Sequence, residues 1–294
     1  MVQYKKKTSI LFTHTDLDGA GCAILFKTFL QVDYVYCIGH GLDNKIDKEI
    51  EKTMSKYNPS EVDVYIADIS PNTTQMMEWL IKNCNSVVVL DHHKSQDFLL
   101  KYKQFNYSLE KCGTSLVRDY LQKKGLWEHK YLKDFDYFVD VINDIDLWLL
   151  QDPFSKDLNK LFSFMGMSKF IEALTDRPQM MYRYNDIIDI LNNTEKNYIE
   201  KALEKKYPCA CGGEYVFAEN YGNEIGNNIA ENNDDKIGIV INMKNKSVSL
   251  RSIGDIDISK IAIANGGGGH KNASGFAFET LDELDKFIKT GNIK

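Results

Sequence analysis

The sequence predicts an α/β protein in which a parallel-sheet domain is followed by a smaller α/β domain. In the first part of the chain, short runs of β-branched and aromatic residues alternate with helical segments of about a dozen residues, as in right-handed βαβ units. After Pro208 the composition shifts, and short strands, two of which form a hairpin, are expected to mix with short helices. With 294 residues and 43% hydrophobic content, the chain is large enough for two domains with sizeable cores.

Strands and helices are expected to alternate up to residue 90. The predicted ranges are strand 9–13, helix 22–30, strand 33–38, helix 44–57, strand 62–67, a helix running to about Asn83, and strand 86–90. Asn58-Pro59 ends the second helix, because proline cannot continue the hydrogen-bond ladder. Pro71-Asn72-Thr73 caps the third helix. This alternation indicates the parallel sheet.

The chain becomes helical from Gly113 onward. Helices are expected at 116–124, 133–143, 157–177 and 185–206. Thr114-Ser115 is placed to cap the first of them. The last becomes increasingly charged toward its end, which favours a connector between domains. The predicted bounds are 1–185 for the first domain, 186–207 for a helical connector and 208–294 for the second domain.

The C-terminal domain is expected to mix strands and helices. The predicted strands are 214–218, 237–243, 248–253 and 275–278, and the predicted helices are 225–231, 258–264 and 281–290. Gly266-Gly267-Gly268-Gly269-His270 is expected to be a loop after a helix, so it is neither a Rossmann nor a Walker loop. Successive glycines expose backbone N–H groups suited to phosphate or sugar, and Arg251 could clamp a phosphate. The plainer alternatives are a flexible loop and a surface arginine.

Acids and histidines follow three of the predicted parallel strands. One strand runs into Leu90-Asp91-His92-His93, another into His14 with Asp16 and Asp18, and a third into Asp68. Each group alone is common as a turn or a helix cap. In an open α/β sheet, however, sites form at the carboxyl ends of the strands. Carboxylates and imidazoles are ligands for Mn²⁺, Mg²⁺, Fe²⁺ or Zn²⁺, so the three groups together predict a metal site.

A further pair of acids, Asp144 and Asp146, lies among large apolar residues. Their neighbours suggest partial burial, and buried carboxylates need partners. One of them could join the metal site, although a helix cap and a surface acid are the plainer alternatives. We favour Asp144, because it follows the apolar Val141-Ile142 run.

Composition limits the classes of partner and compartment. The net charge of −6 argues against a protein that coats long nucleic acid. Of the six cysteines only Cys209 and Cys211 are close, with no second pair at metal-ligand spacing, so a zinc knuckle is not expected and a structural role is preferred. A reducing cytoplasm fits this cysteine pattern. No segment is long enough to span a membrane.

Taken together, these motifs resemble the DHH phosphoesterase superfamily. The first motif is Asp16-Leu17-Asp18-Gly19-Ala20-Gly21, Asp68 is the second, Asp91-His92-His93 is the third and the acid pair around Asp144 fits the fourth. Gly267-Gly268-Gly269-His270, with Ala273-Ser274-Gly275, is similar to the glycine-rich motif of the DHH-associated C-terminal domain. The motifs occur in the family's order over nearly the whole chain. Within the superfamily the chain is most similar to the short nanoRNase and cyclic-dinucleotide phosphodiesterase branch.

The resemblance implies two divalent metal ions, with Mn²⁺ foremost. Asp68 would bridge them, with His14 and Asp16 on one ion and Asp18, His92 and Asp144 on the other. His93 would contact the scissile phosphate, and Asp91 would orient an imidazole, so that the implied catalytic residues are Asp68, His93 and Asp91. The substrate-binding residues it implies are Arg251, Gly267, Gly268, Gly269, His270 and Ser274, with the active-site cleft between the two domains.

The function that this resemblance implies is hydrolysis of short oligonucleotides to mononucleotides by a water activated by two metals. Alternatives are a 3′-phosphoadenosine 5′-phosphate phosphatase, a cyclic-dinucleotide phosphodiesterase and, less well matched, an inorganic pyrophosphatase. An inactive nucleotide-binding sensor is an alternative of another class. The expected partner is a short oligonucleotide or nucleotide, with no membrane association, and a homodimer is left open.

Overall fold

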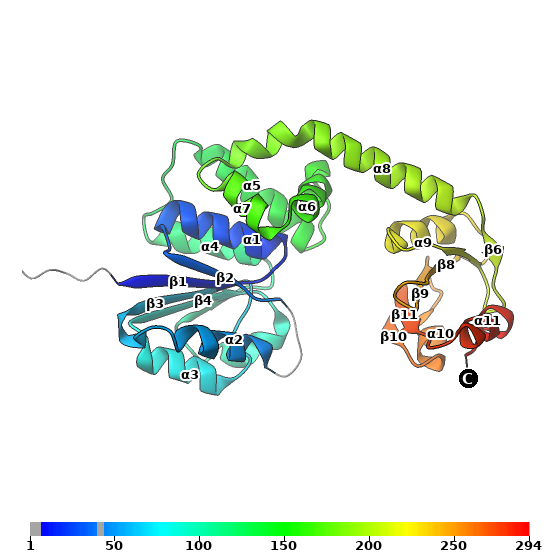
Figure 1. Cartoon of the computed structure of the whole chain (residues 1–294), viewed down its shortest axis with the longest axis horizontal. Helices are drawn as coiled ribbons and strands as arrows, with labels where there is room; N and C mark the ends of the chain where they lie inside the picture. The colour runs from blue at the N-terminus through cyan, green and yellow to red at the C-terminus, as the bar shows by residue number, and fades with distance from the viewer. Residues whose placement is uncertain (1–6, 40–43, 294) are drawn as a thin grey trace, which may run out of the picture. The chain divides into compact units, whose positions relative to one another are not determined.

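The structure is a computed structural model that describes residues 7–39 and 44–293. It divides into two compact units, Met1–Asp189 and Ile190–Lys294 (Figure 1). The long helix α8, Asn185–Leu203, contains the point of division, within the range expected to be a connector. No helix in the two described ranges has the length and apolar character needed to cross a bilayer.

The first unit is built on a five-stranded parallel sheet with the strand order β2-β1-β3-β4-β5. Its strands are β1 (Thr8–Thr13), β2 (Tyr34–Cys37), β3 (Val62–Ala67), β4 (Ser86–Asp91) and β5 (Phe105–Tyr107). The chain leaves β1 toward one edge to form β2 and then returns to form β3 on the other side. This reversal makes the carboxyl ends of β1 and β3 the topological switch point, where open α/β sheets bind ligands.

Helices cover both faces of this sheet (Figure 1). One face carries α1 (Leu17–Leu25), continued by a π-helical turn (Phe26–Leu30), and α4 (Gly113–Lys123), α5 (Leu132–Asp146), α6 (Pro153–Met165) and α7 (Met167–Leu174). The other carries α2 (Lys45–Met54) and α3 (Thr74–Asn83). Side chains alternate along β1. Leu11 therefore packs into the core under α1, α4 and α5, while Ile10 and Phe12 pack into the core under α2 and α3.

Short 3-10 turns link several of these elements, namely Pro59–Glu61, Lys94–Leu99 and Pro178–Tyr184. Two expectations for the helices need correction. The helix expected at 22–30 begins earlier, at Leu17, because Asp16 caps it. The single helix expected at 157–177 is two helices, because Gly166 takes a left-handed φ of +73° between α6 and α7.

The second unit contains a six-stranded mixed sheet with the order β10-β11-β9-β8-β7-β6. Its strands are β6 (Tyr207–Pro208), β7 (Glu214–Phe217), β8 (Ile237–Asn242), β9 (Ser247–Ser252), β10 (Gly268–His270) and β11 (Ala273–Ala277). Its other helices are α9 (Gly222–Glu231), α10 (Ser259–Ala264) and α11 (Leu281–Thr290). The two units together confirm the predicted α/β class.

The sequence suggested that the glycine-rich segment is a loop, but part of this segment is a strand. Gly268–His270 forms the edge strand β10, which pairs antiparallel with β11. Glycine is required just before this strand, because a Cβ on Gly267 would lie 2.1 Å from the carbonyl oxygen of Gly275. The close approach of the two backbones therefore fixes the segment as part of the sheet.

Candidate metal centre

Strand register brings the acids and histidines of the first unit to one end of the parallel sheet. Thr13, the last residue of β1, pairs with Ala67 of β3, and Ala67 pairs with Leu90 of β4. The residues that follow these three positions therefore lie at the same end of the sheet, with Asp91 still paired to Tyr107 of β5. Those residues begin the three polar segments that contain His14, Asp68 and Asp91.

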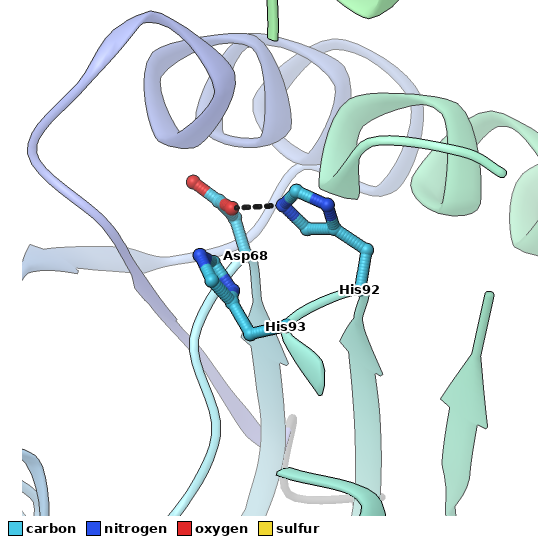
Figure 2. A group of neighbouring side chains, drawn as sticks. All are labelled: Asp68, His92 and His93. Carbon is cyan, nitrogen blue, oxygen red and sulfur yellow. Dashed lines mark hydrogen bonds and ion pairs between the residues drawn. The ribbon is translucent and has the colours of Figure 1, made fainter. Parts of the chain in front are cut away.

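The side chains form a compact cluster around Asp68 and His92. Nε2 of His92 lies 3.2 Å from Oδ1 of Asp68, 3.5 Å from Oδ2 of Asp146 and 3.8 Å from Oδ2 of Asp18. Figure 2 draws the contact between His92 and Asp68 as a dashed line. On the other side of Asp68, Nδ1 of His14 lies 3.9 Å from Oδ2. Three groups have all their ligand atoms within 4.8 Å of one another, namely Asp68/His92/His93, His14/Asp16/Asp68 and Asp18/His92/Asp146.

Asp68, like His92, belongs to two of these three groups. It is 1% exposed and adopts a left-handed φ of +60°, which aspartate tolerates better than most side chains. Its backbone N–H donates to the carbonyl of Leu90 at 2.9 Å, so the turn after β3 is tied to β4. Its buried Oδ2 accepts no hydrogen bond from the part of the chain that the structure describes. A buried carboxylate oxygen of this kind needs a partner, and a bound cation is one group that can supply it.

The electrostatics of the cluster also call for cations. Burial, reinforced by the nearby carboxylates of Asp18 and Asp16, holds the pKa of Asp68 well above its usual value. Burial and the same two acids raise the pKa of Asp146 to about 7. The pKa of Asp16 moves the other way, to about 2, because hydrogen bonds from His14 and Gly19 outweigh its burial. Carboxylates and imidazoles in this arrangement fit divalent cations that accept oxygen and nitrogen ligands.

Asp91 is fully buried and is occupied by hydrogen bonds within the protein. Its Oδ1 accepts from Nδ1 of His93 at 2.8 Å and from the backbone N–H of His92 at 2.7 Å, while its Oδ2 accepts a hydrogen bond from the hydroxyl of Ser70. The bond to Asp91 raises the pKa of His93 and fixes its ring, which lies beside Asp68 (Figure 2). Sequence reasoning missed Ser70, whose only signal is its place two residues after Asp68.

Asp18 links the cluster to a helix that begins almost a hundred residues later. Its carboxylate accepts the backbone N–H groups of Gly113 at 2.6 Å and of Thr114 at 2.7 Å, and it is 2% exposed. The hydroxyl of Thr114 donates back to the carbonyl of Asp18 at 2.8 Å. The expectation that Thr114-Ser115 caps this helix was therefore wrong, because α4 begins at Gly113 and Asp18 satisfies its first free N–H groups.

Asp146, not Asp144, reaches the cluster. Residues two apart on a helix project about 200° apart around its axis, so the two acids of α5 cannot face the same site. The carboxylate of Asp144 accepts the backbone N–H groups of Gln151 at 2.8 Å and Asp152 at 3.2 Å, and its carbonyl accepts that of Leu149 at 2.8 Å. The apolar run Val141-Ile142 correctly indicated that Asp144 is buried, but the partners of Asp144 are backbone groups of the following loop.

This geometry predicts different effects for two matched variants. Asp146→Ala should weaken Mn²⁺ binding at least ~10-fold, because it removes a group beside His92. Asp144→Ala should leave Mn²⁺ affinity within about threefold but lower the thermal unfolding midpoint by about 3–6 °C, because backbone N–H groups lose their acceptor. Isothermal titration of chelator-treated protein and a thermal melt measure the two effects. The assignment is wrong if Asp144→Ala is the variant that loses metal binding.

In the second unit, the structure brings Arg251 and His270 to one face of the sheet. His270 pairs with Ala273, and Ala273 pairs with Arg251, so the three side chains share a face. Arg251 donates to the carbonyl of Leu250 at 2.7 Å and is hydrogen-bonded to Asn223. Asn223 lines a polar hollow of about 410 Å³.

Ser274 does not join this face. It pairs with Leu250 on the side of the sheet that carries the core, is 6% exposed, and donates its hydroxyl to the carbonyl of His270 at 2.6 Å. In this structure the hydroxyl of Ser274 therefore holds the β10–β11 turn, and its role in substrate binding stays a prediction. Gly267 and Gly269 are exposed, whereas Gly268 is partly buried.

Comparison with known proteins matches two families. The family described as "DHH family, N-terminal domain" matches residues 8–137, and the DHHA1 domain matches residues 216–292. The chain is 29% identical to oligoribonuclease NrnB of Bacillus subtilis, over 90% of this chain and 71% of that protein. It is 22% identical to a 3′,5′-cyclic-nucleotide phosphodiesterase of Helicobacter pylori, over 90% of both chains.

Solved structures share the fold at low sequence identity. RecJ from Thermus thermophilus in complex with Mn²⁺ aligns with a TM-score of 0.56 at 14% identity, covering 96% of this chain and 50% of that one. The pGpG-specific phosphodiesterase PggH of Vibrio cholerae aligns with a TM-score of 0.57 at 14% identity, covering 95% of this chain and 97% of that one. These likenesses concern the fold of the chain.

Proposed function

Because this chain belongs to the DHH superfamily of phosphoester hydrolases and carries a DHHA1 domain, we propose that it hydrolyses short oligonucleotides to mononucleotides. The observation that carries the proposal is the buried cluster around Asp68, whose carboxylate faces ligand atoms on two sides. An oligoribonuclease among its relatives supports the choice of substrate.

Two groups of side chains would hold two divalent ions, for which we propose Mn²⁺. His14 and Asp16 would bind one ion and Asp18, His92 and Asp146 the other, with the Asp68 carboxylate reaching both. Such ions supply an activated water and stabilise charge on the entering and leaving oxygens. The donor set fits them, because Oδ2 of Asp68 accepts no hydrogen bond from the described residues and the nearby carboxylates of Asp18 and Asp16 disfavour its charged form in the absence of a cation.

His93 is proposed to act on the scissile phosphate. Asp91 accepts a hydrogen bond from Nδ1 of His93, which orients the ring. The raised pKa of His93 favours its protonated form. A protonated imidazole at this position would hold a proton at Nε2 and hydrogen-bond a phosphate oxygen, while Ser70 and the backbone keep Asp91 in place.

Arg251, His270 and the glycines Gly267, Gly268 and Gly269 are proposed to bind the phosphate or nucleotide part of the substrate. Arg251 and His270 share one face of the second sheet, and the polar hollow beside Asn223 gives room for a nucleotide group. The 36 Lys and Arg residues are outnumbered by 42 acids, and this net charge of −6 gives little affinity for a long polyanion, since binding to such a chain depends on phosphate contacts by cations. This balance favours substrates of a few nucleotides.

A cyclic-nucleotide or dinucleotide signal is the second candidate substrate. The relatives that favour it are a 3′,5′-cyclic-nucleotide phosphodiesterase and a pGpG-specific phosphodiesterase. Hydrolysis of 3′-phosphoadenosine 5′-phosphate would use the same metal cluster. These candidates differ in the groups that contact the base and sugar, so substrate turnover has to separate them.

A Mn²⁺-dependent time course on 5′-labelled RNA of two, three, five and twenty-four nucleotides tests the proposal. Cyclic dinucleotides, pGpG and 3′-phosphoadenosine 5′-phosphate would run in parallel, and chelator-treated protein would serve as the control. We expect dimers to be converted to mononucleotides while the 24-mer is spared. Turnover of a cyclic substrate alone would replace the oligonucleotide proposal, and silence on every substrate despite bound manganese would favour a sensor.

A further inference from the structure

The turn between β6 and β7 holds two cysteines in one rigid backbone frame. It consists of Cys209-Ala210-Cys211-Gly212-Gly213. The N–H of Cys209 donates to the carbonyl of Gly213 at 3.1 Å, and that of Gly212 donates to the carbonyl of Cys209 at 3.0 Å. Gly212 and Gly213 take φ values of +94° and +74°, which permit the reversal.

The rest of the second unit fixes this turn from two sides. The N–H of Gly213 donates to the carboxylate of Asp235 at 2.7 Å, and the N–H of Ala210 donates to the carbonyl of Ile288 in α11 at 3.0 Å. A Cβ on Gly213 would lie 2.2 Å from the carbonyl oxygen of Ile237, so the backbone there is packed tightly. The two cysteines are therefore held by more than their own turn.

The two sulfurs face each other within this frame. Sγ of Cys209 lies 3.2 Å from Sγ of Cys211. A disulfide bond is about 2.0 Å long, so the pair needs to close by roughly 1.2 Å to form one. Cys209 is 7% exposed and Cys211 is partly exposed, so a small reagent has access to the second sulfur.

The electrostatics of the pair favour thiol chemistry. The hydrogen bond from Cys211, against the effect of burial, lowers the pKa of Cys209 to about 7. The same shared proton, with burial, holds the pKa of Cys211 well above its usual value. One thiolate is therefore available near neutral pH, as in Cys-X-X-Cys pairs. By contrast, burial raises the pKa of Cys22, Cys112 and Cys84.

We propose that Cys209 and Cys211 form a redox-active dithiol site that exchanges with small-molecule disulfides. The shared proton rests mainly on Cys211, but Cys211 is the more exposed sulfur. When the proton moves to Cys209, the thiolate of Cys211 attacks one sulfur of the disulfide and expels the first small thiolate. Cys209 then loses its proton and attacks the sulfur of Cys211, which forms the intramolecular disulfide and expels the second thiolate. Two cysteine thiols are thereby oxidised, one small disulfide is reduced to two thiols, and the two cysteine protons balance the charge.

Oxidised glutathione is the probe for this site. The reduced full-length protein would be incubated with it, quenched in acid, denatured, labelled with N-ethylmaleimide and weighed intact. Wild type, with six cysteines, should fall from six labels to four without a glutathione adduct at the pair, and dithiothreitol should restore six. Peptide mapping would locate the missing labels at Cys209 and Cys211.

Three variants separate this site from other thiols. Cys209→Ser should accumulate a glutathione adduct on Cys211 at least ~10-fold above wild type, because the resolving thiol is gone. Cys211→Ser, at the more exposed position, should lose the two-label change even if Cys209→Ser folds poorly. Cys37→Ser, which removes an exposed cysteine of the first unit, should still lose two labels. Six labels in oxidised wild type, or a two-label loss that survives in Cys211→Ser, would overturn the proposal.

Discussion

Asp68→Asn is expected to lower kcat/KM on a dinucleotide by at least ~1,000-fold while the protein stays folded. Asparagine keeps the size of the side chain and tolerates the left-handed backbone at this position, where φ is +60°. It removes the charge that faces ligand atoms on both sides of the residue. Steady-state kinetics with saturating Mn²⁺, together with circular dichroism of the variant, would measure the effect.

The same variant should be at least as stable as wild type when metal is removed. In the metal-free protein Asp68 is a buried carboxyl whose pKa is raised by burial and by neighbouring acids, so it disfavours the folded state above its unfolded pKa. Asparagine does not titrate, so the variant lacks that effect. The difference in unfolding free energy between Asp68→Asn and metal-free wild type should therefore grow from pH 5 to pH 8. Urea unfolding in the presence of a chelator at both pH values provides the check. Full activity of Asp68→Asn would refute the metal assignment, whatever its stability.

Asp18→Ala is expected to abolish activity and also to destabilise the metal-free protein, by about 2 kcal/mol. Its carboxylate satisfies the buried N–H groups of Gly113 and Thr114 at the start of α4, in addition to lying beside His92. Alanine would leave both N–H groups without their acceptor. Urea unfolding with a chelator isolates this structural effect from any loss of bound metal.

His92→Ala is the matched control for Asp18→Ala. It also removes a cluster side chain, but the hydrogen bonds of His92 run to acids of the cluster rather than to the end of a helix. Activity should therefore fall in both variants, whereas metal-free stability should fall clearly more in Asp18→Ala. Equal stabilities would mean that the contact between Asp18 and α4 contributes little to folding.

The sequence predicted the sheet and the position of the site because both depend on local patterns. Alternating runs such as 62–67 gave the strands, and polar residues directly after them had to lie at one sheet edge. His14, Asp68 and His92 are found together for that reason. Their role as metal ligands remains a prediction.

The predictions failed where a residue's partner lies far away in sequence, or where the position of a residue around a helix axis determines the direction of its side chain. Burial near Val141 singled out Asp144, but the direction of a side chain on α5 depends on its turn around the helix axis. The start of α4 depends on Asp18, which no local pattern near Thr114 contains. The pairing of Gly268 with Gly275 likewise requires knowledge of the neighbouring strand.

The placement of the cluster has a consequence for biosynthesis. Its residues run from His14 to Asp146, so all of them lie within the first unit, Met1–Asp189. The 105 residues of the second unit, Ile190–Lys294, take about 5–20 s to synthesise at typical rates. During that interval the nascent chain already carries every acid and histidine of the cluster. The first unit also has its own hydrophobic cores, so the cluster can assemble before the second unit has been made.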